Sequence, residues 1–306
     1  MAAVSKGKWF MYTKKRFAAV IAAVLAIVML LTAVCACDGE SAQEPMQPTQ
    51  NEGPATVRVT FPEGQNIMQM SQRLEKNGVC SAADLIAQMN STDYSAEYSF
   101  LPSFAELEGR EYKLEGYMFP DTYDFYVGES ADSVIRRFLN NFRNRIPQEL
   151  MDACASTGDF YGQSMSFDDI IIMASIVERE INVPSEMPGV AAVFYNRMKY
   201  PGGTVSGSAT GGYFQSDATK FYPYVYDTVP EGFVSEYNTF NVKGLPKGPI
   251  CCPSYNAIYG SIYPDNSNEA FFFYTDINKK VYYAVTLKEH QASWKYCRDN
   301  GLEPVW

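Results

Sequence analysis

Two glutamates, Glu178 and Glu180, are the residues of this sequence best placed to do chemistry. They come at the end of the segment Ile170–Arg179, in which eight of ten side chains are apolar or small. Asp168 and Asp169 precede this segment and suit the positive end of a helix dipole, and Pro184 stops the helix soon after Glu180. A helix that is apolar almost all round is typically buried, so the sequence predicts a buried helix that ends in carboxylates.

The two glutamates point in different directions on such a helix. At about 100° per residue, positions 178 and 180 are roughly 200° apart, so they do not share one pocket. Glu180 falls on a stripe of bulky apolar residues, Met173, Ile176 and Val177, and Glu178 on a stripe of smaller ones, Ile171, Ala174 and Ser175. Apolar surroundings raise the pKa of a carboxyl, so Glu180 is the better candidate for a general acid. The alternative, that both glutamates are solvated at the surface end of the helix, is equally compatible with the pattern.

The remaining pattern predicts an α+β fold. A second helix is expected over 186–199 with Ser185 as its cap, an amphipathic helix over 132–146, and a hairpin of two short strands over 270–283. A strand at 57–61 and helices at 66–77 and 81–89 suggest a small module over 57–95. This module is either a LysM-like, glycan-recognising unit or a structural spacer. The catalytic domain is expected over 110–306.

The N-terminal residues predict a membrane anchor over 1–37. Several lysines and one arginine precede an uncharged apolar run from Phe17 to Cys37, which is long enough to span a bilayer. The basic flank places the N-terminus in the cytoplasm and the main body outside. Val34-Cys35-Ala36-Cys37 also resembles a lipobox, so a lipid anchor at Cys37 is the second reading, and a cleaved signal peptide is the third. Residues 38–56 read as a flexible linker.

Composition excludes several classes of function. The net charge of −10 argues against nucleic acid as a partner. The single histidine, His290, excludes an H-E-x-x-H metalloprotease, and no G-x-S-x-G motif is present. Two of the seven cysteines lie in the anchor, and the other five, which have no C-x-x-C spacing, suggest packed, reduced thiols with at most one pair rather than a zinc site. We therefore expect no metal and no cofactor, and either carboxylate chemistry or no chemistry.

Short polar clusters amid Gly and Pro follow the central helices. They are Gln215-Ser216-Asp217, Tyr237-Asn238-Thr239-Phe240 and the segment 244–249. A glycine-rich loop over 201–212 comes before them and contains neither phosphate-loop motif. Such clusters suit a substrate-binding loop, and they equally suit ordinary turns.

Taken together, these blocks resemble the bacterial endolytic murein transglycosylases, the YceG-like (MltG-like) family. The segment IIIMASIVEREINVPSEMPGVAAVFYNRMK is similar to the signature of that family. Four further blocks occur in the family's order, LEGYMFPDTYDF, the Q-S-D cluster, YNTFNVKGLPKGPICCP and Glu289-His290. VTFPEGQNIMQMSQRLEKNG resembles the family's segment with the LysM-like module. The likeness extends from about Val57 to the C-terminus.

The resemblance implies cleavage of the MurNAc–GlcNAc β-1,4 bond of peptidoglycan strands, leaving a 1,6-anhydro end. By position it makes Glu180 the catalytic acid and then base, which is the glutamate that the helical stripe also favours. It makes substrate-positioning groups of Gln215, Ser216, Asp217, Tyr237, Asn238 and Thr239. Secondary candidates are Glu178, Glu115, Asp121 and His290. Glycan strands are the implied substrate, and peptidoglycan synthases are possible partners.

The chain departs from the family pattern in its loops. Ala218 replaces a proline after the Q-S-D cluster, Phe240 and Lys247 replace a tyrosine and a proline, and the stretch between Arg197 and Gln215 is longer. Two rival functions stay open. One is a hydrolase that uses Glu180 with Asp217 or Asp121 and water. The other is a non-catalytic wall-binding or scaffolding protein; a solute-binding lipoprotein ranks below both because no two-lobe α/β pattern is visible.

Overall fold

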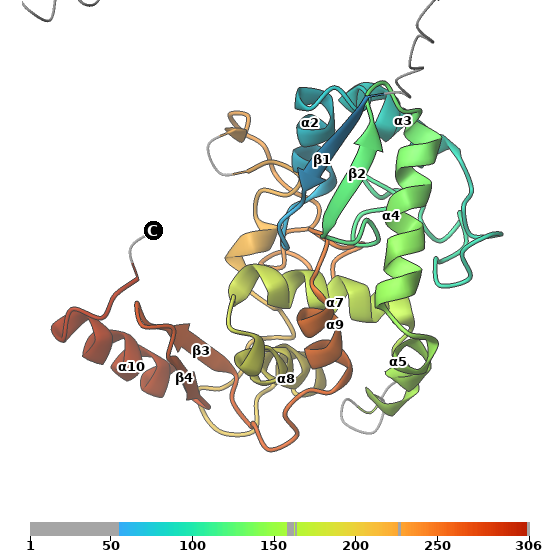
Figure 1. Ribbon diagram of the computed structural model, residues 1–306. Coiled ribbons are helices and arrows are strands. Elements are labelled where there is room, and N and C mark those ends of the chain that lie inside the picture. The colour runs from blue at the N-terminus through green and yellow to red at the C-terminus, as the bar shows by residue number, and fades with distance from the viewer. Residues whose placement is uncertain (1–54, 158–161, 163, 226–227, 305–306) are drawn as a thin grey trace, which may run out of the picture. The chain divides into compact units, whose positions relative to one another are not determined.

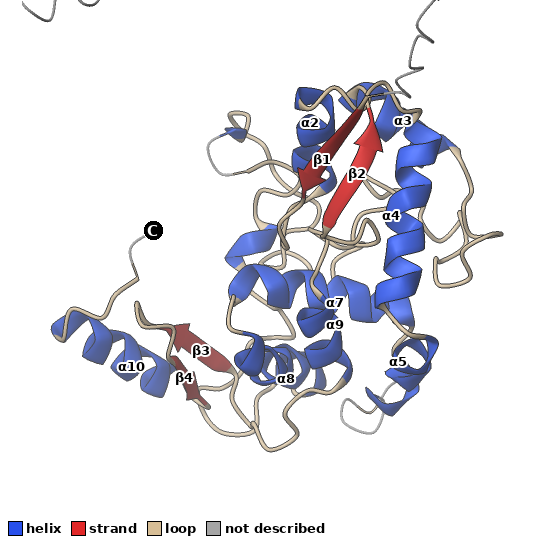
Figure 2. Cartoon of the chain, viewed as in Figure 1, coloured by secondary structure: helices blue, strands red, loops and turns tan. Residues whose placement is uncertain are grey.

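The computed structural model describes residues 55–157, 162, 164–225 and 228–304. They belong to one compact unit, Gly53–Trp306. Helices dominate this unit, and two separate two-stranded antiparallel sheets accompany them (Figure 2). The predicted α+β class is confirmed.

The first sheet is closed by a strand far along the chain. β1 (Thr56–Thr60) pairs with β2 (Thr122–Tyr126), with Thr56 opposite Tyr126 and Thr60 opposite Thr122. α2 (Ile67–Lys76) and α3 (Ala82–Ser91) lie between these strands in sequence. The strand that completes this β-α-α-β arrangement therefore lies outside the range 57–95.

α4 (Ala131–Arg145) packs beside this sheet, as Figure 1 shows. Its apolar face is built around Phe138, whose ring lies 5.1 Å from that of Phe61 and 4.5 Å from that of Tyr123. Phe125 joins the same cluster at 5.8 Å. Alternate residues of β2 are buried, so the period-2 pattern of the strand supplies one side of this core and the amphipathic helix the other.

The centre of the unit is α7 (Phe167–Glu180), which packs against α8 (Met187–Lys199) and α9 (Tyr255–Ile262). All residues from Ile170 to Val177 are buried, which confirms the predicted buried helix. The helix starts at a capping box in which Ser166 and Asp169 each bond the other's backbone N–H. Short helical segments flank it, α5 (Gln148–Asp152), η1 (Ala153–Ser156), η2 (Pro184–Glu186) and η3 (Asp217–Thr219).

The C-terminal part is a hairpin with one helix. β3 (Phe272–Thr275) and β4 (Val281–Ala284) pair antiparallel, which confirms the predicted hairpin, and α10 (Leu287–Asp299) packs on both strands. The Asp276 carboxylate accepts the N–H groups of Asn278 and Lys280 and so fixes the turn.

One local prediction is wrong, because Ser185 is not the cap of the second helix. Residues Pro184–Glu186 form a 3-10 turn, and α8 begins at Met187 with no side-chain cap. Pro188 in the first turn of α8 lacks an N–H, so that turn has fewer donors that require a capping oxygen.

Two further predictions concern the thiols and the N-terminus. Cys80, Cys154, Cys251, Cys252 and Cys297 are free thiols, as expected. The anchor over 1–37 and the linker as far as Pro54 lie outside the described residues. Among the helices that the structure does describe, none combines the length and the apolar character needed to cross a membrane.

Candidate active site

The last turn of α7 directs its two glutamates to different partners. Glu178 accepts hydrogen bonds from the backbone N–H of Ser254 at 3.0 Å and from its hydroxyl at 2.5 Å. Ser254 is the cap of α9, so Glu178 fastens the start of one central helix to the end of another. Burial raises the pKa of Glu178, and the Ser254 bonds oppose that rise. Glu178 therefore has a structural role, because its carboxylate holds α7 and α9 together.

Glu180 lies on the other side and meets the loop that follows α8. Its Oε1 accepts a hydrogen bond from the hydroxyl of Ser216, and the residue is half-buried. Burial raises the pKa of the Glu180 carboxyl, while the Ser216 bond and the charge of Arg197 lower it. A carboxyl in this state can hold a proton nearer neutral pH than a solvated one, which is what a general acid requires.

Ser216 is held in place by two buried threonines. Its backbone N–H donates to Thr239 Oγ1 at 3.1 Å, and the Thr219 hydroxyl donates to its carbonyl at 2.7 Å. The two threonine hydroxyls are 2.9 Å apart. Because the single proton of Thr219 is directed at Ser216, Thr239 must be the donor within the threonine pair. The network therefore fixes the backbone of Ser216 and leaves its hydroxyl to donate to Glu180.

The neighbours of Ser216 in the Q-S-D cluster face solvent. Gln215 is exposed and has a φ of 53°, a left-handed conformation that is uncommon for a residue with a side chain. Asp217 is 80% exposed at its side chain and forms an ion pair with Lys220 at 2.5 Å. The charge of Asp217 raises the pKa of Glu180. Strained backbone of this kind gathers at binding sites, so Gln215 fits a ligand-facing position.

The second polar cluster divides between two tasks. Thr239 belongs to the network at Glu180, as described above. Tyr237 is buried instead, where its hydroxyl accepts the N–H of Glu111 at 3.2 Å and its ring packs 4.5 Å from that of Tyr222. Asn238 uses its side-chain oxygen to accept the N–H of Phe240, forming a turn. Of this cluster, Thr239 is the residue that the structure joins to the Glu180 network.

Arg197, near the C-terminal end of α8, is a member of the site that the sequence patterns did not single out. It is 7% exposed. Its guanidinium donates to the carbonyl of Phe271 at 2.7 Å and to that of Phe214, two residues before Ser216. Burial lowers the pKa of Arg197 to about 10, and the charge of Glu180 opposes the shift. The sequence signal for this residue was the Y-N-R motif, which places an arginine near the C-terminus of an otherwise apolar helix.

The other secondary candidates have separate surroundings. Glu115 is fully buried and accepts from the Ile67 N–H, the Tyr222 hydroxyl at 2.9 Å and the Cys252 thiol. Asp121 accepts from Thr122, Asn141 and Arg145 at the start of β2. These two carboxylates hold segments of the fold together.

His290 packs against the C-terminal hairpin. Its ring stacks on Phe272 at 5.6 Å, and its Nδ1 has no hydrogen-bond partner within the described part of the chain. Burial and the charge of Arg197 lower its pKa, so the ring stays neutral at neutral pH.

Comparison with known proteins shows the family of this chain. The model of the YceG-like family matches residues 38–295, and the chain belongs to that family. An endolytic murein transglycosylase of Streptococcus pneumoniae is 27% identical over 254 residues, which cover 78% of this chain and 44% of that protein. A protein of the same description from Bacillus subtilis is 26% identical over 197 residues, covering 61% of this chain and 49% of the relative.

A solved structure is also similar. The crystal structure of a YceG-like protein from Listeria monocytogenes matches with a TM-score of 0.61 at 26% identity, and covers 79% of this chain and 76% of that one. The chain spans about half the length of the curated relatives it matches.

Proposed function

We propose that this chain is an endolytic murein transglycosylase that cleaves the MurNAc–GlcNAc β-1,4 bond within peptidoglycan strands. The observation that carries the proposal is Glu180 itself. It is a half-buried carboxyl at the end of a buried helix, with a raised pKa and one fixed hydroxyl donor, Ser216. The family and the described activity of the two curated relatives support the same reaction class.

The reaction needs one carboxyl that acts twice. Protonated Glu180 gives its proton to the glycosidic oxygen as the bond from that oxygen to C1 of MurNAc breaks. The resulting carboxylate then takes the proton of the MurNAc 6-hydroxyl while that oxygen bonds to C1. The products are a free GlcNAc 4-hydroxyl and a 1,6-anhydro MurNAc end, and Glu180 is protonated again.

The neighbouring carboxylates favour this single-acid route over hydrolysis. An inverting or retaining hydrolase uses a second carboxylate opposite the acid. Glu178 is bonded to Ser254, and Asp121 is paired with Arg145. Asp217 is paired with Lys220 and mostly exposed. Each rival partner for Glu180 therefore has another role in the fold or faces solvent.

Ser216 and its threonine supports would hold Glu180 in a productive rotamer, and Gln215 and Asp217 would contact the sugars from the exposed side. We also propose that β1, α2 and α3 supply a LysM-like contact to glycan, and that the segment 17–37 anchors the chain with its catalytic part outside the cell membrane. Peptidoglycan synthases are the expected partners there, since they make the strands that would be cut.

The test is digestion of purified sacculi in water enriched in oxygen-18, followed by mass spectrometry of the fragments. The proposal predicts 1,6-anhydro ends without the heavy isotope, because no water enters the product. Reducing ends that carry oxygen-18 would instead show a hydrolase, and intact sacculi would favour a binding or scaffolding role.

A further inference from the structure

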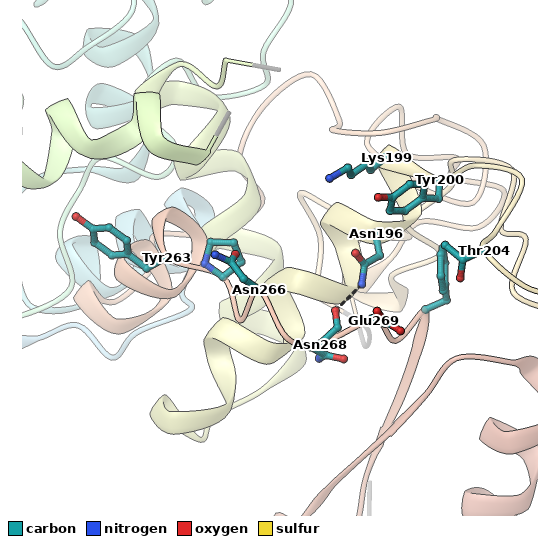
Figure 3. Close-up of a pocket in the computed structure, with 10 residues that line it drawn as sticks. Asn196, Lys199, Tyr200, Thr204, Tyr263, Asn266, Asn268 and Glu269 are labelled. Carbon is teal, nitrogen blue, oxygen red and sulfur yellow. Dashed lines mark hydrogen bonds between the residues drawn. The ribbon is translucent and has the colours of Figure 1, made fainter. Parts of the chain in front are cut away.

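A pocket apart from the Glu180 cluster opens at the C-terminal end of α8. Its volume is about 650 Å³, within the range of small-molecule and peptide sites. Figure 3 shows Asn196 between Lys199 and Tyr200, at and just after the end of α8, and the segment that carries Asn268 and Glu269. Glu180 and Ser216 are not among the residues that line it.

The wall of this pocket is fixed by side-chain amides. Asn196 is 5% exposed and donates from Nδ2 to the carbonyls of Asn268 and Ala270, both at 2.9 Å. Asn268 in turn donates to the carbonyl of Gly189 at 3.0 Å and accepts the Ala270 N–H. The segment 268–270 is thus bonded to α8 at both Asn196 and Gly189. The pocket is therefore preformed, and little of the protein has to become ordered when a ligand binds.

Arg197 joins this pocket to the proposed catalytic acid. The guanidinium donates to the carbonyl of Phe271, which lines the pocket, and to that of Phe214, which leads into the Ser216 loop. The same cation acts electrostatically on Glu180. Arg197 therefore bonds both to the backbone of a residue that lines the pocket and to the segment that leads to Ser216.

The lining carries both signs of charge. Lys199 and Glu269 are exposed at the pocket, together with the amide of Asn266 and the aromatic rings of Tyr200 and Tyr263. A cation, an anion, an amide and aromatic surface together match a peptide that has carboxylates and an amine. They match a run of uncharged sugar rings less well.

We propose that this pocket binds the stem peptide of the strand that is cleaved at Glu180. The inference rests on the proposed function, because peptidoglycan is the substrate that presents a charged peptide beside a glycosidic bond. The peptide carboxylates would meet Lys199 and its amine would meet Glu269. The enzyme would then recognise strands that still carry their peptides.

Cleavage by the full-length chain in detergent tests this proposal. The substrates are peptide-bearing glycan strands and the same strands stripped by an amidase. We expect the wild type to have the lower KM for peptide-bearing strands. The double variant Lys199→Gln/Glu269→Gln should raise that KM about two- to twenty-fivefold, since each exposed ion pair contributes a factor of about 1.4 to 5. Lys288→Gln, which removes an exposed charge from α10, is the matched control. An equal KM for both substrates in the wild type, or an equal effect of the double variant on both, would overturn the proposal.

A binding experiment separates this proposal from the proposed function. The full-length Glu180→Gln variant is titrated with the isolated peptide L-Ala-γ-D-Glu-L-Lys-D-Ala, and the side-chain amide resonances of Asn196 and Asn268 are followed by NMR. Shifts at both resonances that weaken at high salt support the pocket. Absence of shifts while the wild type cleaves strands refutes the pocket alone, whereas peptide binding without cleavage by the wild type refutes the proposed function alone.

Discussion

Glu115 gives the sharpest test of how burial acts on the acids of this fold. It is 1% exposed, and burial raises its pKa from 4.5 to about 7, although the Ile67 N–H, the Tyr222 hydroxyl and the Cys252 thiol all favour its ionised form. The folded protein therefore holds a proton on Glu115 at pH values where the unfolded chain has lost it. Protonation of Glu115 therefore contributes fully to the free energy of unfolding below pH 4.5, and this contribution is lost as the pH rises through about 7.

The magnitude follows from the two pKa values. Each pH unit between them corresponds to about 1.4 kcal/mol, so the full effect of Glu115 is roughly 3 kcal/mol. Glu115→Gln cannot ionise and should remove this dependence. We expect the free energy of unfolding of the wild type to fall by about 2–3 kcal/mol relative to the variant between pH 5 and pH 8.

The assay is urea unfolding of the compact unit Gly53–Trp306 at several pH values. Other groups also titrate in this range, so the quantity of interest is the difference between variant and wild type. Glu111→Gln is the matched control, because Glu111 is exposed on a neighbouring turn. A difference between Glu115→Gln and wild type that does not change with pH would refute the reasoning.

Two other substitutions probe the site and the packing behind it. Ser216→Ala removes the hydroxyl that favours ionised Glu180, so the alkaline limb of kcat/KM should move up by about one pH unit; a limb that stays in place or moves down would contradict the role of Ser216. Gly116→Ala should lower the free energy of unfolding, measured in urea, by about 1–3 kcal/mol more than Gly109→Ala. Both glycines have left-handed φ values, but a Cβ at Gly116 would lie 2.5 Å from Ile171 whereas one at Gly109 meets nothing within 4 Å. Equal losses in the two variants would show that backbone conformation, not contact, sets the cost.

Local pattern was sufficient for the elements that place the candidate acid. The eight apolar or small residues Ile170 to Val177 predict a buried helix, and they place Glu180 at its C-terminal end. The hairpin followed equally from two short strand-like runs around a turn in which the Asp276 carboxylate accepts the backbone N–H of Asn278. Ser185 was predicted as a cap because serine is a favourable N-cap residue. In the structure it lies inside the 3-10 turn Pro184–Glu186, and α8 begins two residues later, at Met187.

Long-range contacts were beyond the reach of local pattern. Ser216 meets Glu180 from 36 residues away, and Glu115 meets Tyr222 across 107 residues. The donation from Thr219 to Ser216 is local, but its significance depends on Thr239, 20 residues further on. Arg197 likewise acquires its role only when the carbonyls of Phe214 and Phe271 converge on it. The sequence could point to such residues by motif, but their hydrogen-bond partners became known only from the fold.

The most direct test of the central claim is the rate at which the full-length chain releases muropeptides from sacculi, compared between Glu180→Gln and Glu178→Gln. Both residues lie in the last turn of α7, but Glu180 accepts a hydrogen bond from Ser216 and Glu178 from Ser254. Both variants keep the shape of the side chain. With folding verified by circular dichroism, the account predicts that Glu180→Gln lowers the rate at least 100-fold, the usual contribution of a general acid, while Glu178→Gln retains most of it. Wild-type rates in folded Glu180→Gln would contradict the account.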